Sequence, residues 1–172
     1  MIEVLVAMLV VSFGVLAMSG LLTNSTRYGK TTEFRAIATL LANDIADRMR
    51  ANPLGVGGGN YALTDAYDRL TEPPDANDNC TQAAPCTGDN GVGMAARDLA
   101  DWRRALYFGL PGGAGYVSPS ADGTAADIWV GWTDPQAVEE TEAGDAVRKE
   151  CPDVFAGNAS PRPRCAYFRV GL

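Results

Sequence analysis

The sequence has 172 residues, enough for one ordinary domain and an appendage, with 14 basic and 21 acidic side chains and a formal net charge of −7. Because phosphate binding needs a basic face, this charge argues against a nucleic-acid partner. The sequence contains no histidine, which excludes His-based catalytic triads, His-ligated zinc and imidazole acid–base chemistry.

The chain opens on an apolar segment. Among the 19 residues from Val4 to Leu22 only Ser12 and Ser19 are polar. In a helix with a rise of 1.5 Å per residue they would span about 28 Å, close to the hydrocarbon thickness of a bilayer. A secretory signal peptide needs a basic stretch ahead of its apolar run, whereas an acidic residue, Glu3, stands there. We therefore predict a transmembrane helix segment over residues 1–22.

The helical pattern continues beyond this segment. Apolar residues recur at spacings of three and four, which is typical of an amphipathic helix: Phe34, Ile37, Ala38, Leu41, Ala42, Ile45 and Met49. Arg48 and Arg50 suit the negative end of a helix dipole, and Asn52-Pro53 ends the pattern. We expect one helix of about fifty residues, with an amphipathic continuation over 23–52 and a globular domain over 53–172. The alternative is a plain anchor followed by an unrelated short helix.

Glu3 places a charge at the head of the apolar segment. An ionised carboxylate at mid-depth in a membrane costs roughly 2.5–3.5 kcal/mol, and the dipole at a helix N-terminus lowers that cost. A cation would lower it further, and the natural one is a free α-amino group of the same chain or of a neighbouring subunit. The alternative is an interfacial glutamate that contacts lipid headgroups and has no further role.

Four cysteines stand at positions 80, 86, 151 and 165, and none forms a CxxC motif. Behind a membrane anchor, an even number favours two disulfides in an oxidising compartment. Three connectivities are possible, and we favour the local pairs Cys80–Cys86 and Cys151–Cys165. The second would close a loop of 15 residues and stabilise the fold by ~3 kcal/mol. The alternative is four unpaired buried thiols in a cytosolic protein.

The stretch DANDNC (75–80) begins like a calcium loop. It lacks the glycine of the sixth position, and Cys86 stands where the bidentate glutamate belongs, so we interpret it as a solvated turn. The sequence also lacks GxSxG and SxxK motifs. We therefore expect no catalytic residues, no metal and no cofactor.

The C-terminal part predicts a small α+β domain. The spacing of Ala95, Leu99, Trp102 and Leu106 predicts a helix over 95–107, with Trp102 as a core anchor. The following GLPGGAG is interpreted as a turn. Alternation predicts a strand over 126–132, with Ile128, Val130 and Trp132 on one side and Trp129 on the other, and a second strand over 165–172.

Three stretches of the sequence resemble the type IV pilin-like family, in particular the PilV-type minor pilins and the related minor pseudopilins of type II secretion. MIEVLVAMLVVSFGVLAMSGLL resembles the N-terminal segment of that family, in which a glutamate lies shortly after the prepilin peptidase cleavage site, and Glu3 matches that glutamate. RAIATLLANDIADRMRANP (35–53) and DLADWRRALYFGLPGG (98–113) are similar to PilV-type segments.

The resemblance implies a pilin-like fold, in which a long N-terminal helix packs on a small antiparallel sheet. It also implies that Glu3 pairs with a neighbouring subunit's N-terminal amine as the subunit leaves the bacterial inner membrane and joins a filament. The implied partners are other minor pilins and the major pilin, the assembly machinery of the inner membrane, prepilin peptidase acting on the precursor, and membrane lipid before assembly. The globular domain would lie in the periplasm and take part in priming pilus assembly.

The sequence departs from the family at its start. Family precursors carry a short basic leader that ends in glycine, and the mature chain begins with Phe and one further residue before the equivalent of Met1. These residues are not present, so cleavage and N-methylation are assigned to no residue of this sequence. Two alternatives to a minor pilin stay open: a minor pseudopilin of type II secretion, and a membrane-tethered periplasmic binding domain that does not polymerise.

Overall fold

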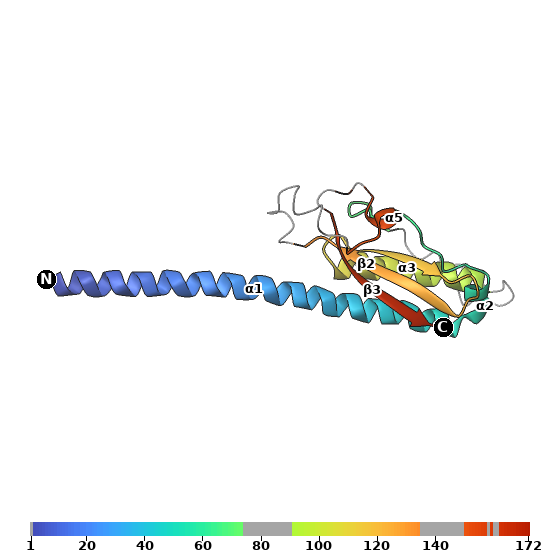
Figure 1. Cartoon of the computed structure of the whole chain (residues 1–172), viewed down its shortest axis with the longest axis horizontal. Helices are drawn as coiled ribbons and strands as arrows, with labels where there is room; N and C mark the ends of the chain where they lie inside the picture. The colour runs from blue at the N-terminus through green and yellow to red at the C-terminus, as the bar shows by residue number, and fades with distance from the viewer. Residues whose placement is uncertain (1, 74–90, 135–149, 158, 160–161) are drawn as a thin grey trace, which may run out of the picture. The chain divides into compact units, whose positions relative to one another are not determined.

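The structure, a computed structural model, describes residues 2–73, 91–134, 150–157, 159 and 162–172. Its contacts divide the chain into two compact units, Met1–Phe34 and Arg35–Leu172. The first unit consists of the first part of helix α1 (Ile2–Ala51). The second unit contains the end of α1 and all the other elements (Figure 1).

The prediction of one helix of about fifty residues is confirmed, since α1 is a single helix of 50 residues. It ends where the sequence indicated. Asn52 caps a second, short helix, α2 (Pro53–Gly57), because its side-chain oxygen accepts a hydrogen bond from the Gly55 N–H at 3.2 Å. Pro53 stands in the first turn of α2, where a missing N–H costs nothing.

Three antiparallel strands form one sheet in the order β1–β2–β3. The strands are β1 (Ala114–Pro119), β2 (Ala125–Trp132) and β3 (Arg164–Gly171). The two predicted strands correspond to β2 and β3 within one residue at each end. Strand β1 was not predicted, because its first two residues, Ala114 and Gly115, were interpreted as part of the turn GLPGGAG and the glycine breaks the alternation.

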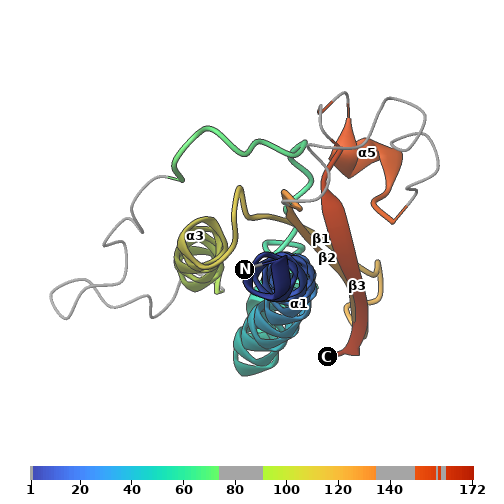
Figure 2. The ribbon, with the colours of Figure 1, turned by 90° about the vertical axis from the view of Figure 1, so that its left-hand side faces the viewer.

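The core lies between one face of this sheet and the helices. On β2 the side chains of Ile128, Val130 and Trp132 are buried there, as the alternation predicts. Helix α3 (Val92–Gly109), predicted over 95–107, places the fully buried Trp102 against Gly115 of β1. A Cβ at position 115 would lie 2.3 Å from the indole ring, so the close packing of α3 on β1 requires glycine. Viewed along the helices, α3 lies beside the second part of α1, with the sheet packed against them (Figure 2).

The opposite face of the sheet carries the helical turn α5 (Asp153–Ala156). Phe155 of α5 is fully buried and lies against Gly131 of β2. A disulfide between Cys151 and Cys165 ties the segment before α5 to β3. The described elements therefore form an α+β unit with a long N-terminal helix, as expected.

Candidate assembly surface

The first part of α1 exposes an apolar surface on every side. Between Ile2 and Leu22 the large apolar side chains are each 56–76% exposed: Ile2, Val4, Leu5, Val6, Met8, Leu9, Val10, Val11, Phe13, Val15, Leu16, Met18, Leu21 and Leu22. By length and composition, α1 can cross a membrane, and the apolar stretch that meets this test has no residue buried within the structure. So large an apolar surface needs a cover of lipid or of other protein segments.

The few hydroxyl groups of this segment are satisfied within the helix. Ser12 Oγ donates to the Met8 carbonyl at 2.7 Å, and Ser19 Oγ donates to the Val15 carbonyl at 2.9 Å. A hydroxyl that donates to a carbonyl of the preceding turn can be buried in an apolar environment at little cost in free energy. The segment therefore suits burial in lipid or among apolar helices along its whole length.

Glu3 lies in the first turn of α1 and is exposed. The free backbone N–H groups of this turn favour an anion. Ala7 and Val11, four and eight residues further on, lie on the same side of the helix as Glu3. None of the basic side chains that the structure describes forms an ion pair with Glu3. Its pairing with an N-terminal amine stays a prediction.

The second part of α1 differs because one of its faces is buried in the Arg35–Leu172 unit. Ala38, Ala42, Ile45 and Met49 are each at most 1% exposed, as the apolar stripe predicts. The Trp102 indole N–H donates to the Leu41 carbonyl at 2.7 Å, which ties α3 to α1.

A polar network holds the end of α1 against α3. Arg48 Nη1 lies 3.2 Å from Asp98 and 3.7 Å from Asp101, and its Nε lies 3.0 Å from Asp44. The Tyr61 hydroxyl donates to Asp98 and accepts a hydrogen bond from the Asn52 amide at 3.2 Å. Burial and the bond to Asp98 raise the pKa of Tyr61 well above its usual value. Only the Asp44–Arg48 spacing of four residues could have suggested this network, because the other partners lie far apart in the sequence.

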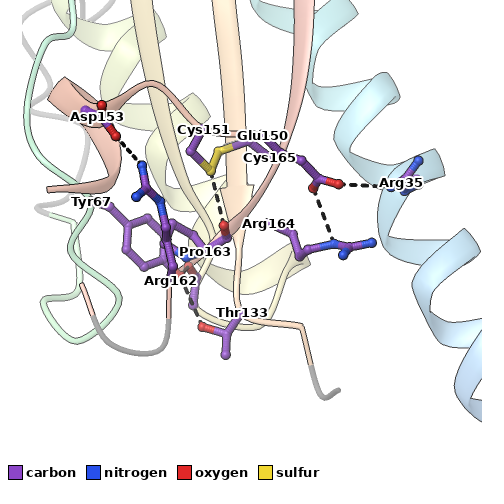
Figure 3. Close-up of a disulfide and its surroundings, with 11 residues drawn as sticks. Arg35, Tyr67, Thr133, Glu150, Cys151, Asp153, Arg162, Pro163, Arg164 and Cys165 are labelled. Atoms are coloured by element: carbon purple, nitrogen blue, oxygen red, sulfur yellow. Dashed lines mark hydrogen bonds and ion pairs between the residues drawn. A yellow bond between two sulfur atoms is a disulfide. The ribbon is translucent and has the colours of Figure 1, made fainter. Parts of the chain in front are cut away.

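The disulfide Cys151–Cys165, one of the two pairs that we favoured, is present with a Cα–Cα distance of 5.2 Å. The residues just before each cysteine also pair, since Arg164 Nε lies 3.4 Å from Glu150 Oε2 (Figure 3). Arg164 Nε also lies 3.5 Å from the buried carboxylate of Asp134, and Glu150 reaches Arg35 of α1 at 3.9 Å. The covalent link is thus joined to the helix by a chain of ion pairs.

The expected pair Cys80–Cys86 and the expected turn at 75–80 lie outside the described residues. Within the part of the chain that the structure describes, no group of three or more Cys, Asp or Glu residues is arranged to hold a metal ion. The arrangement therefore offers surfaces for burial and pairing, with Glu3 as the charged group of the exposed segment.

Comparison of the chain with protein-family models, with curated proteins and with solved structures finds no match in any of the three.

Proposed function

We propose that this chain is a minor pilin subunit of a type IV pilus, of the PilV type, which takes part in priming pilus assembly and adds to the structure of the tip. The observation that carries the proposal is the apolar surface of α1 from Ile2 to Leu22, uncovered on every side, with one carboxylate in its first turn. The resemblance of the three stretches in the sequence supports the same function.

The proposed mechanism involves no chemical reaction. Before assembly, lipid of the bacterial inner membrane covers the apolar segment, while the rest of the chain lies in the periplasm. In the filament, apolar helices of neighbouring subunits replace the lipid contacts. Because lipid and apolar helices cover this surface about equally well, the apolar surface by itself does not drive the transfer.

In this proposal, the carboxylate of Glu3 determines where the subunit enters the filament. An unpaired carboxylate in an apolar environment is costly, and a neighbouring N-terminal amine would remove most of that cost. The subunit would therefore be accepted only where such an amine lies next to Glu3. The disulfide between Cys151 and Cys165 suits the oxidising periplasm in which we place the domain.

Expression of the full gene with and without prepilin peptidase tests this proposal. We expect the peptidase to shorten the protein, and we expect the shortened form to sediment with sheared pili. A protein that is shortened but is needed for type II secretion and absent from pili would be a minor pseudopilin. A protein that is never shortened and never found with filaments would be a membrane-tethered binding domain, contrary to the proposal.

Substitution of Glu3 by alanine tests the role of the carboxylate. We expect the amount of Glu3→Ala protein in sheared pili to fall by about tenfold or more, since the lost ion pair lies in an environment of low dielectric. The folding of the Arg35–Leu172 unit should not change. Glu33→Ala is the matched control, because Glu33 is an exposed acid of the same helix that forms a local ion pair with Lys30 at 2.7 Å. Normal incorporation of Glu3→Ala would leave Glu3 as an interfacial residue without a role in assembly.

A further inference from the structure

The outer face of the sheet, on the side away from α1 and α3, carries a row of three aromatic residues. The register of the strands pairs Tyr116 of β1 with Trp129 of β2, and Trp129 with Tyr167 of β3. The ring centroids are 5.6 Å apart in the first pair and 4.9 Å apart in the second. The three rings therefore form a continuous aromatic row across the whole sheet.

The end of this row at Tyr116 packs against α5 and the cluster around the disulfide. The ring of Phe155 in α5 lies 5.8 Å from that of Tyr116, and both Tyr116 and Trp129 pack against the cluster around the disulfide. Their partial burial fixes their positions without covering the row. The other end is open, since the side chain of Tyr167 is 51% exposed.

A polar pair lies next to the open end of the row. Asp127 and Arg169 face each other one step along the same face, and their charged groups are 3.7 Å apart. The Tyr167 hydroxyl donates to Asp127 Oδ1 at 2.7 Å, and this bond raises the pKa of Tyr167 above its usual value. The hydrogen bond thus orients the phenol toward the carboxylate.

An exposed aromatic ring beside a carboxylate and a guanidinium matches the chemistry of a sugar ring. The C–H bonds of a pyranose carry a partial positive charge and are attracted to the negative face of an aromatic ring, while its hydroxyls can donate to a carboxylate and accept from a guanidinium. An aromatic surface with a few placed polar groups is the usual composition of a binding site.

Charge selects the class of sugar. Asp127 and Arg169 neutralise each other locally, and the chain as a whole carries a net charge of −7. This charge disfavours nucleic acids and acidic polysaccharides, and the balanced local pair suits a ligand with no charge.

We propose that this face, at Trp129, Tyr167, Asp127 and Arg169, binds an uncharged oligosaccharide. The site is separate from the apolar segment and goes beyond a role in filament assembly. It would give a filament subunit, or equally a membrane-tethered domain, the ability to hold a glycan.

Calorimetric titration of the full chain in phosphatidylcholine nanodiscs tests the proposal, because that lipid has no sugar head group to occupy the site. The probes are three uncharged tetrasaccharides, N-acetylchitotetraose, cellotetraose and maltotetraose, with tetragalacturonate as the acidic control. We expect saturable binding of at least one uncharged probe and none of the acidic one. Tryptophan fluorescence should change in parallel, since Trp102 and Trp132 are buried and Trp129 is not fully so.

Variants locate the binding. Tyr167→Ala should weaken the affinity about tenfold or more through loss of the aromatic face. Tyr167→Phe, which keeps the ring and removes only the hydroxyl, should weaken it less. Phe108→Ala is the matched control, because Phe108 is an aromatic residue of α3 that is 66% exposed, and its loss should change nothing.

Three results would overturn the proposal. They are the absence of binding of all three uncharged probes at millimolar concentration, equal effects of Tyr167→Ala and Phe108→Ala, and a preference for the acidic probe. Self-association of the chain that Tyr167→Ala abolishes, without any sugar binding, would assign the face to a contact between copies instead.

Discussion

The two parts of helix α1 contrast sharply although they belong to one helix. From Ile2 to Leu22, the open half, all the large apolar side chains are more than half exposed. From Arg35 to Ala51, the covered half, one stripe of apolar side chains is buried, with Ala38, Ile45 and Met49 fully so, while Leu40 on another side is 69% exposed. The difference shows that the helix itself follows from local sequence, whereas the distribution of apolar residues around it decides what must cover it.

The largest loss of stability that tests this contrast is expected from Trp102, which packs against the covered half of α1 and donates a hydrogen bond to it. Trp102→Ala removes one of the two fully buried tryptophan side chains, the largest in the described core, and the hydrogen bond to the Leu41 carbonyl. We expect the free energy of unfolding of the Arg35–Leu172 unit to fall by about 3–5 kcal/mol, measured by guanidinium denaturation of the full chain in nanodiscs.

Leu9→Ala provides the matched comparison. It also truncates a large apolar side chain of the protein, but one that is 56% exposed in the open half. The unfolding free energy of the Arg35–Leu172 unit should not change. A loss comparable to that of Trp102→Ala would mean that the two halves are energetically coupled, and the contrast between them would be wrong.

An intermediate effect is expected from the disulfide, which lies on the face of the sheet away from the covered half. Replacement of both Cys151 and Cys165 by alanine should lower the free energy of unfolding by ~3 kcal/mol, because the unfolded chain gains the freedom of an open loop. Under native conditions the near-UV circular dichroism of the buried Trp102 and Trp132 should be retained. Loss of that signal would show that the covered half depends on the disulfide for its packing.

The smallest of the three destabilising effects is expected from Tyr61, whose hydroxyl belongs to the polar network at the end of the covered half. Tyr61→Phe should cost about 1–2 kcal/mol at neutral pH, since Asn52 and Asp98 lose a partner.

The same substitution should change the pH dependence of stability. The pKa of Tyr61 is raised in the folded state, so its contribution is fully present below the usual pKa of about 10 and is lost as the pH rises above that value. The free energy of unfolding, measured at a series of pH values between neutral and ~11, should therefore fall more steeply with pH for the unsubstituted chain than for Tyr61→Phe. Parallel curves would show that the Tyr61 hydroxyl titrates at its ordinary pKa.

Much of the secondary structure could be predicted because its causes are local. The apolar run and the stripe after it predict α1, and Asn52-Pro53 marks its end within a residue. Alternation predicts β2 and β3. Strand β1 escaped prediction because Gly115 breaks its pattern, and the reason for that glycine, the ring of Trp102, lies on another element.

For the candidate site, the sequence by itself determined the apolar segment and the position of Glu3, since both depend only on the order of residues along one helix. Tertiary structure decided which charges meet. Arg48 joins Asp98 across fifty residues of sequence, and Arg35 reaches the disulfide through Glu150. It also decided that Tyr116, Trp129 and Tyr167 form one row, because only the strand register brings side chains from three separate segments side by side. Contacts between distant segments are set by packing and register, and these leave no periodic pattern in the sequence.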